Sequence, residues 1–170
     1  MSSRVAHPSL LSALALEFPL RHRTNPWSLV YSTALHGMSL QSLYRRAQGV
    51  APSVLLVRDM KGYVFGAYVT SPWRVHHRYY GEGETFVFRL SPRGAAYHWD
   101  QSADSEASTN QFFQLGEPES IALGGDGGFA LRLDGDLKYG SSRPSGTFRN
   151  PILASTADFM VETLEVWWLR

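Results

Sequence analysis

From residue 53 onward the chain is a succession of short apolar segments separated by turn residues. Phe86, Phe88 and Leu90 alternate with Val87 and Arg89, which is the period of two expected of a strand. Further segments of this kind are SVLLVRD, GYVFGAYVT, AAYHW, QFFQL, SIALGG, GFALRLD and FMVETLEVWWL, and RDMKGY between the first two indicates a hairpin turn. Short strands at this spacing predict an α+β, mainly β domain, a two-sheet antiparallel β-sandwich with peripheral helices.

Two helices and one strand are predicted before this region. SLLSALALEFPL favours a helix that Ser9 caps and Pro19 ends, and SLQSLYRRAQG favours a second helix. In the second helix Ser39 is the expected N-cap and Gly49 lies where a C-terminal cap belongs. Between the two helices, WSLVYST suits a buried strand.

Composition sets the class of protein. A chain of 170 residues with 44% hydrophobic residues, 18% charged residues and a net charge of +1 predicts one globular domain over residues 1–170. This charge gives no reason to expect nucleic-acid binding or membrane insertion. The chain has no cysteine, which excludes disulfides, thiolate nucleophiles and cysteine-bound metal. The apolar run LLSALALEF is too short to span a bilayer and has no cleavage site, so we expect a cytoplasmic protein, with the nucleus as an alternative.

The stretch GGDGGFALRLDGDLKYGSS (residues 124–142) contains six glycines and three aspartates. It lacks the Gly-x-x-x-x-Gly-Lys-Ser/Thr pattern of a phosphate loop, and its acidic part lacks the spacing and terminal glutamate of a calcium loop. Asp134, Gly135 and Asp136 follow an alternating segment, and Asp and Gly tolerate the left-handed backbone of a hairpin turn. We therefore expect a turn here rather than a phosphate or metal site.

The basic and aromatic stretch WRVHHRYY (residues 73–80) leaves alternatives open. It can stack on single-stranded nucleic acid, hold a metal through His76 and His77, or form a solvated loop or strand, which we favour. In an extended chain these two histidines point to opposite faces, which disfavours one shared ion. The polar segment DQSADSEASTN (residues 100–110) is expected to be a mobile loop.

No complete catalytic constellation is found in the sequence. Ser141, Ser142 and His98 have no Gly-x-Ser-x-Gly elbow around them, so a hydrolase triad is not predicted. Glu82 and Glu84 are two residues apart, which places both on one face of a strand. Paired carboxylates can perform acid–base chemistry, or they can form an exposed acidic patch, which we favour. We therefore predict no catalytic residue, no cofactor and no metal.

Six blocks in the same order resemble the TLDc domain family over roughly residues 9–170. They are PWSLVYSTALHGMSLQSLYRRAQG, GYVFGAYVTSPW, YYGEGETFVFRL, GGDGGFALRLDGDLKYGSS, TFRNPILA and LEVWWL. The resemblance implies a β-sandwich, a role in resistance to oxidative stress and binding to the vacuolar proton pump, the V-ATPase. It implies no established catalytic mechanism. Many members carry a cysteine shortly before the Thr-Phe element, where this chain has Ser145, so a thiol peroxidase is excluded here.

Three functional hypotheses follow. The first is a non-enzymatic interaction domain that binds catalytic-sector subunits of the V-ATPase, is linked to oxidative-stress resistance, and meets the membrane only through the pump. Its candidate contacts to a basic partner surface are the loop carboxylates Glu82, Glu84, Asp134 and Asp136. The second is an enzyme in which Glu84 acts with a nearby serine or histidine. The third is a structural subunit of a larger assembly, suggested by the aromatic final segment LEVWWLR.

Overall fold

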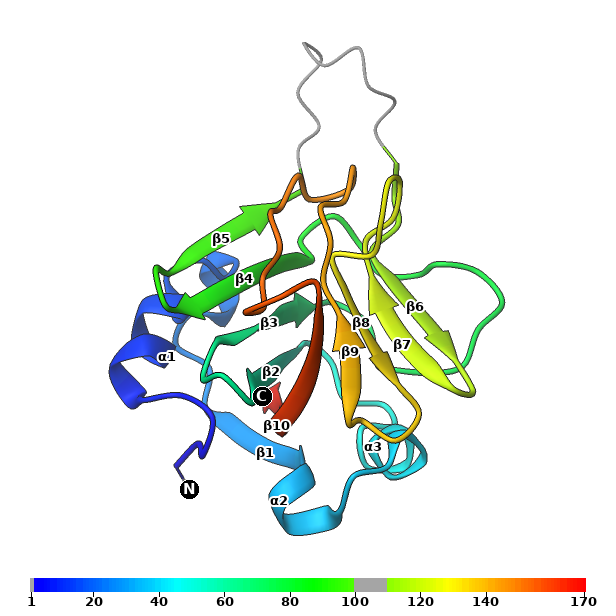
Figure 1. Ribbon diagram of the computed structural model, residues 1–170. Coiled ribbons are helices and arrows are strands. Elements are labelled where there is room, and N and C mark those ends of the chain that lie inside the picture. Colours follow the sequence, from blue (N-terminus) through cyan, green and yellow to red (C-terminus); the bar gives the residue numbers. More distant parts are fainter. Residues whose placement is uncertain (1, 100–109) are drawn as a thin grey trace, which may run out of the picture.

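The computed structural model describes residues 2–99 and 110–170, so the predicted loop 100–110 lies outside the described residues except for Asn110. The chain is mainly β with short helices, as predicted (Figure 1). The helices are α1 (Pro8–Ala15), the 3-10 turn η1 (Leu20–His22), α2 (Thr33–His36) and α3 (Leu40–Arg46). The strands are β1 (Trp27–Ser32), β2 (Ser53–Asp59), β3 (Val64–Val69), β4 (Phe86–Ser91), β5 (Ala95–His98), β6 (Gln114–Glu117), β7 (Ser120–Leu123), β8 (Leu131–Asp134), β9 (Tyr139–Ser141) and β10 (Asp158–Leu169).

The strands of the described residues form one continuous antiparallel sheet. Its order is β5-β4-β3-β2-β10-β9-β8-β7-β6, and β1 pairs with β10 outside this path. Two separate sheets, as a sandwich requires, are therefore not confirmed. The physical reason is the length of β10, whose first residues pair with β9 while the remainder pairs with β2. One strand thus joins the two halves into a single open sheet.

Both halves of the sheet contribute to one hydrophobic core. Leu55 and Phe65 from β2 and β3 belong to the same buried cluster as Ile121, Leu131 and Phe159 from β7, β8 and β10. The ring of Phe65 meets that of Phe159 edge-on at 5.0 Å. The sheet must therefore bend so that its two ends share this core.

A second core covers the other face of β2, β3 and β4. Val54, Tyr68 and Phe86 are buried there together with Leu14 of α1 and Phe18. Both faces of β2 are consequently covered, which explains why SVLLVRD is a continuous apolar run rather than an alternating one.

The helix ends only partly follow the sequence prediction. Ser39 caps α3 as expected, because its Oγ accepts the N–H of Ser42 at 3.3 Å. The C-cap of this helix is Ala47, and Gly49 follows it with φ +72°. Ser9 does not cap α1: the cap is His7, whose Nδ1 accepts the N–H of Ser9 at 3.3 Å. Proline is favoured at the first helical position, and with Pro8 in that position the helix begins two residues earlier than predicted.

The hairpin of β2 and β3 is confirmed by their antiparallel register. Strand β9 was not predicted, because three residues that include Gly140 give no alternating signal. Within residues 2–99 and 110–170, no helix combines the length and apolarity needed to cross a bilayer.

Gly66 in β3 provides a test of how tightly the sheet is packed. A Cβ at this position would lie 1.8 Å from the carbonyl oxygen of Leu55 and 3.2 Å from the ring of Phe88. We expect Gly66→Ala to lower the free energy of unfolding by about 3 kcal/mol, the upper end of overpacking costs. The measurement is urea unfolding followed by tryptophan fluorescence.

The matched control is Gly94→Ala in the turn between β4 and β5. Its added Cβ would lie 3.3 Å from its nearest neighbour, and its φ is not positive. This contact needs only a small shift of the neighbouring carbonyl, so we expect a loss of about 1 kcal/mol or less for this variant. Equal effects of the two substitutions would contradict the close packing at Gly66.

Candidate functional site

The glycine-rich stretch that begins at residue 124 packs against a second loop, residues 143–147, and we call this pair of loops the interlock. Gly124 and Gly127 have φ of +82° and +96°, a conformation that favours glycine. A Cβ on Gly125 would lie 2.7 Å from the ring of Phe112. The N–H of Gly146 donates to the carbonyl of Gly125 at 3.0 Å. The glycines thus allow residues 124–128 to pack against residues 143–147, in agreement with a turn rather than a ligand cradle.

Ser145, which lies near the family's frequent cysteine position, is part of this interlock. Its Oγ donates to Asn150 Oδ1 at 2.7 Å and accepts the N–H of Phe148 at 3.2 Å. The amide nitrogen of Asn150 in turn donates to the carbonyl of Arg143 at 3.0 Å. The hydroxyl is buried and engaged in both directions, so its contribution is structural.

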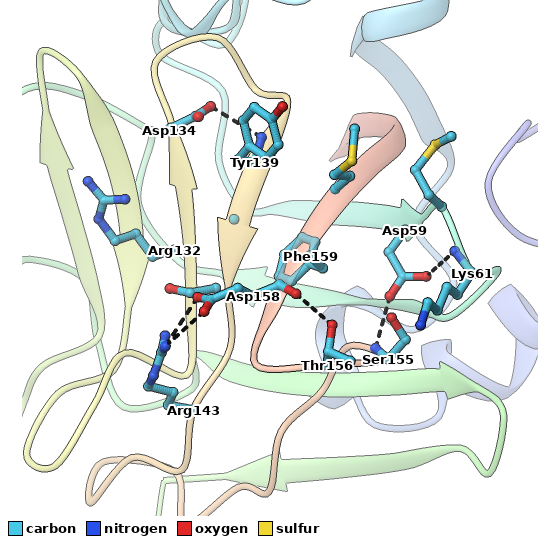
Figure 2. A pocket seen from close by; sticks show the side chains of 14 residues that line it. Asp59, Lys61, Arg132, Asp134, Tyr139, Arg143, Ser155, Thr156, Asp158 and Phe159 are labelled. Atoms are coloured by element: carbon cyan, nitrogen blue, oxygen red, sulfur yellow. Dashed lines mark hydrogen bonds and ion pairs between the residues drawn. The ribbon is translucent and has the colours of Figure 1, made fainter.

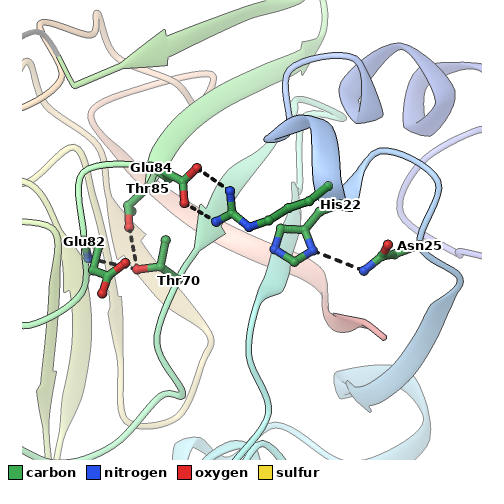
Figure 3. A network of polar contacts seen from close by, with 7 residues as sticks. His22, Asn25, Thr70, Glu82, Glu84 and Thr85 are labelled. Carbon is green, nitrogen blue, oxygen red and sulfur yellow. Dashed lines mark hydrogen bonds and ion pairs between the residues drawn. The ribbon is translucent and has the colours of Figure 1, made fainter.

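The side chains of Glu82 and Glu84 point away from each other (Figure 3). The prediction that a strand places them on one face is wrong, because both precede β4 and residues 83 and 84 form a turn. The carboxylate of Glu84 accepts two N–H groups from Arg21 in η1, one of them at 2.9 Å and the other shorter. Glu82 is held through its backbone: its N–H donates to Thr70 Oγ1 at 2.9 Å, and its carbonyl accepts the N–H of Thr85 at 3.0 Å. The two carboxylates therefore do not work as an acid–base pair.

The ion pair decides the charge of Glu84. Its hydrogen bonds from Arg21 lower the pKa of the Glu84 carboxyl, so the group is ionised at neutral pH. A general acid needs the opposite shift. Because the two side chains are 60% and 40% exposed, water and salt screen the pair strongly. Sequence reasoning missed Arg21, which lies 63 positions from its partner.

Asp134 is the last residue of β8, and Asp136 lies in the turn between β8 and β9. Asp134 Oδ1 accepts the N–H of Lys138 at 3.2 Å and so holds the turn closed. Asp136 is exposed, and its carboxylate makes no hydrogen bond in the described part of the chain. The N–H of Leu40 donates to the carbonyl of Gly135 at 3.1 Å, which places this turn against α3. The predicted hairpin turn is thus confirmed.

The four predicted contact residues do not gather into one cluster. Glu84 is bound to η1, whereas the Asp134 turn lies against α3. Among the described residues, no three histidine or acidic side chains converge as metal ligands do. The four residues are therefore available only as separate contact points on two turns.

A groove of about 530 Å³ opens between β8, β9, the start of β10 and the turn after β2 (Figure 2). Three apolar side chains at its rim are largely exposed: Met60, Tyr139 and Met160. Asp59 is buried beside it, and its carboxylate accepts the N–H groups of Lys61 and Ser155 at 3.0 and 2.9 Å. Nothing in the sequence pattern pointed to this groove, because its walls come from segments far apart in the chain.

The hydroxyl groups that line the groove have carboxylates but no histidine among their described neighbours in the groove. Ser141 lines it, but no histidine is among the described lining residues. Ser142 is buried, and its Oγ donates to the carbonyl of Ala130 at 2.7 Å. His98 lies on β5 and pairs with Glu17 at 2.8 Å. The serines and the histidine considered for a triad are thus held in separate places.

The histidine pair of the 73–80 stretch also differs from the prediction. The rings of His76 and His77 stack at 4.6 Å rather than pointing to opposite faces. The reason is that residues 72–79 form an irregular loop and not an extended strand. This stretch is the solvated loop that we favoured.

Comparison with known proteins gives one family. The model of the TLDc domain matches residues 1–170. Nuclear receptor coactivator 7 from Homo sapiens is 42% identical over 159 residues, which are 92% of this chain and 16% of that protein. Oxidation resistance protein 1 is 42% identical over 159 residues in Xenopus tropicalis (92% of this chain, 18% of that protein) and 40% identical over 167 residues in Rattus norvegicus (97% and 19%). The chain therefore spans less than a fifth of the length of these relatives.

A substitution at Asp59 tests how much this buried carboxylate contributes to the stability of the fold around the groove. In addition to the two bonds above, Asp59 accepts the N–H of Tyr63 at 3.0 Å. Asp59→Ala leaves three backbone donors without this acceptor, and we expect it to lower the free energy of unfolding by about 3 kcal/mol. Asp136→Ala, which removes an exposed carboxylate, is the control and should change it by less than about 0.5 kcal/mol. Urea unfolding measures both, and a small effect at Asp59 would contradict this role.

His36 predicts a pH dependence of stability. Its Nδ1 accepts the N–H of Ser32 at 3.0 Å, which only an unprotonated Nδ1 can do. Burial, together with the nearby charge of Arg46, lowers the pKa of His36 below its ordinary value of 6.5. The folded state thus binds fewer protons than the unfolded state as the pH falls through 6.5, so this stability is present above that pH and lost below it.

The test compares thermal unfolding of the wild type and His36→Gln between pH 8 and pH 5. We expect the midpoint of the wild type to fall more steeply with decreasing pH than that of the variant. Parallel curves for the two proteins would show that His36 does not contribute.

Proposed function

Because the chain belongs to the TLDc domain family, we propose that it is a non-enzymatic protein-interaction domain that binds catalytic-sector subunits of the V-ATPase and supports resistance to oxidative stress. The oxidative-stress role is supported by the relatives that carry the name Oxidation resistance protein 1 and match 92–97% of the chain. The pump is the partner that the family resemblance implies. The proposal places the protein in the cytoplasm.

The observation that carries this proposal is the family match in a chain without cysteine. Thiolates are the protein groups that reduce peroxides directly, and this chain has none. Methionine sulfur is left, but its oxidation modifies the protein and needs a separate reductase to reverse it. Protection by this chain therefore suits action through a partner better than removal of the oxidant.

The four proposed contact residues differ in whether their carboxylates are bonded within the chain. Glu82 and Asp136 are exposed, and their carboxylates accept no hydrogen bond within the described residues. Glu84 is bound by Arg21, and Asp134 holds its own turn. All four remain candidates, but the first two offer their full charge to a basic partner surface, whereas the other two must first give up internal partners.

Two alternative functions have less support. For an enzyme that uses Glu84, the carboxylate is already occupied by Arg21, and the lowered pKa of this carboxyl disfavours it as a general acid. A structural subunit held through LEVWWLR needs that segment to face other chains. Instead Trp167 and Leu169 are buried, and β10 is paired with β1 and with β2.

The test is affinity capture of the tagged protein from native lysate, with and without ATP, followed by mass spectrometry. We expect V-ATPase catalytic-sector subunits to be recovered by the wild type. The double substitution Glu82→Gln with Asp136→Asn should reduce recovery roughly tenfold, since it removes two unpaired carboxylates from the proposed contact.

The matched control removes two other exposed acidic charges by Glu162→Gln with Asp126→Asn. It has the same net charge as the first variant and should retain wild-type recovery. Equal recovery by both variants would remove Glu82 and Asp136 from the contact. Recovery of no pump subunit by the wild type would contradict the proposed partner.

A further inference from the structure

The first part of the connection between β3 and β4 brings two arginines and two histidines close together. Arg74, His76, His77 and Arg78 fall within five positions, and residues 71–80 contain no acidic side chain. The loop projects beside β6, on the right of Figure 1. A chain with a net charge of only +1 thus displays a local basic surface, which the function proposed above does not use.

This loop is held in one conformation by hydrogen bonds within the loop and with β6. Tyr80 Oη both accepts the N–H of Arg74 and donates to its carbonyl, each at 3.0 Å. The N–H of His76 donates to the carbonyl of Gly116 in β6 at 2.9 Å. A Cβ on Gly116 would lie 1.9 Å from the carbonyl oxygen of Arg74, so the glycine permits this close approach. A partner therefore meets a preorganised loop and has little ordering cost to overcome.

The cationic groups of the loop are available. Arg74 and Arg78 are exposed, and neither makes an ion pair with any residue that the structure describes. The guanidinium of Arg74 lies over the ring of Tyr80 at 4.2 Å, and a stacked guanidinium still presents its N–H groups at its edge. Two such groups fit carboxylates, which accept paired N–H bonds from arginine.

The aromatic residues of the loop are not available for base stacking. Trp73 and Tyr80 are buried. Tyr79 packs against Phe112 at 4.7 Å, and its hydroxyl donates to the carbonyl of Gly124 at 2.9 Å. Single-stranded nucleic acids are bound by rings that are free to stack on bases. Val75 is the one large apolar side chain exposed within the described loop, which is little for insertion into a membrane surface.

We propose that residues 74–78 form a docking site for an acidic, carboxylate-bearing segment of a protein partner. Arg74 and Arg78 hold the carboxylates, and His76 and His77 add donors between them. The site differs from the proposed V-ATPase contact in its residues and in the charge of the partner surface that it fits, although Glu82 lies in the same connection between β3 and β4.

The experiment measures fluorescence anisotropy with a labelled sixteen-residue peptide in which glutamate alternates with glycine and serine. The full chain is titrated into the peptide at low and at physiological ionic strength. We expect Arg74→Gln with Arg78→Gln to weaken binding at least about tenfold, since both charge-assisted contacts are lost. The matched control is Arg45→Gln with Arg46→Gln at the exposed end of α3, which removes the same charge and should weaken binding less than about twofold.

Three results would overturn the proposal. The wild type does not bind the peptide, both double variants lose affinity equally, or the loop variant loses binding to an oligothymidylate or to phosphatidylserine vesicles but not to the peptide. The side chain of Arg78 has no bonded partner in the described structure, so Arg78→Glu alone provides a second variant with an intact fold. It should abolish most of the loop-dependent binding, and unchanged affinity would also overturn the proposal.

Discussion

The pairing of β10 is the constraint on which the rest of the structure depends. This last strand of twelve residues pairs with β1, β2 and β9, so the end of the chain lies in the middle of the sheet. Glu165 on this strand is buried, and its carboxylate accepts bonds from the hydroxyl of Ser3 at 2.6 Å, the N–H of Arg4 at 2.8 Å and the indole of Trp167 at 2.8 Å. A buried carboxylate is stable only when it is bonded in this way, so the first residues of the chain are tied to the last strand.

Because residues of the central strand β10 are buried on both of its faces, partner binding is left to the turns and loops around the sheet. The core positions of β10 are used for packing on both faces, and the groove lies at the seam where β10 changes partner from β2 to β9. The exposed carboxylates and the basic loop lie instead on turns that the sheet holds in place. Rigid strands that carry functional loops are a common arrangement in binding domains.

The sequence predicted what local patterns determine. β2, β3 and the helix capped by Ser39 were found because alternation, turns and caps act over a few residues. The turn at Asp134 was found for the same reason. The pair of Arg21 and Glu84, the groove and the single continuous sheet were not found, since each depends on residues brought together by pairing of β10 or by packing of η1. The stacked rings of His76 and His77 were missed because their loop is held by Gly116, 40 positions away.

The distribution of charge matters more for recognition than its sum. The carboxylates of Asp59, Glu84 and Glu165 are occupied by hydrogen bonds within the chain, so they are less free to bind a partner. Glu82, Asp136, Arg74 and Arg78 are exposed and make no ion pair with any residue that the structure describes. Uncompensated charge on a preorganised surface steers a partner and fixes its orientation, whereas internally paired charge does neither. A nearly neutral chain can therefore present an acidic and a basic contact at once, and each selects partners that the other repels.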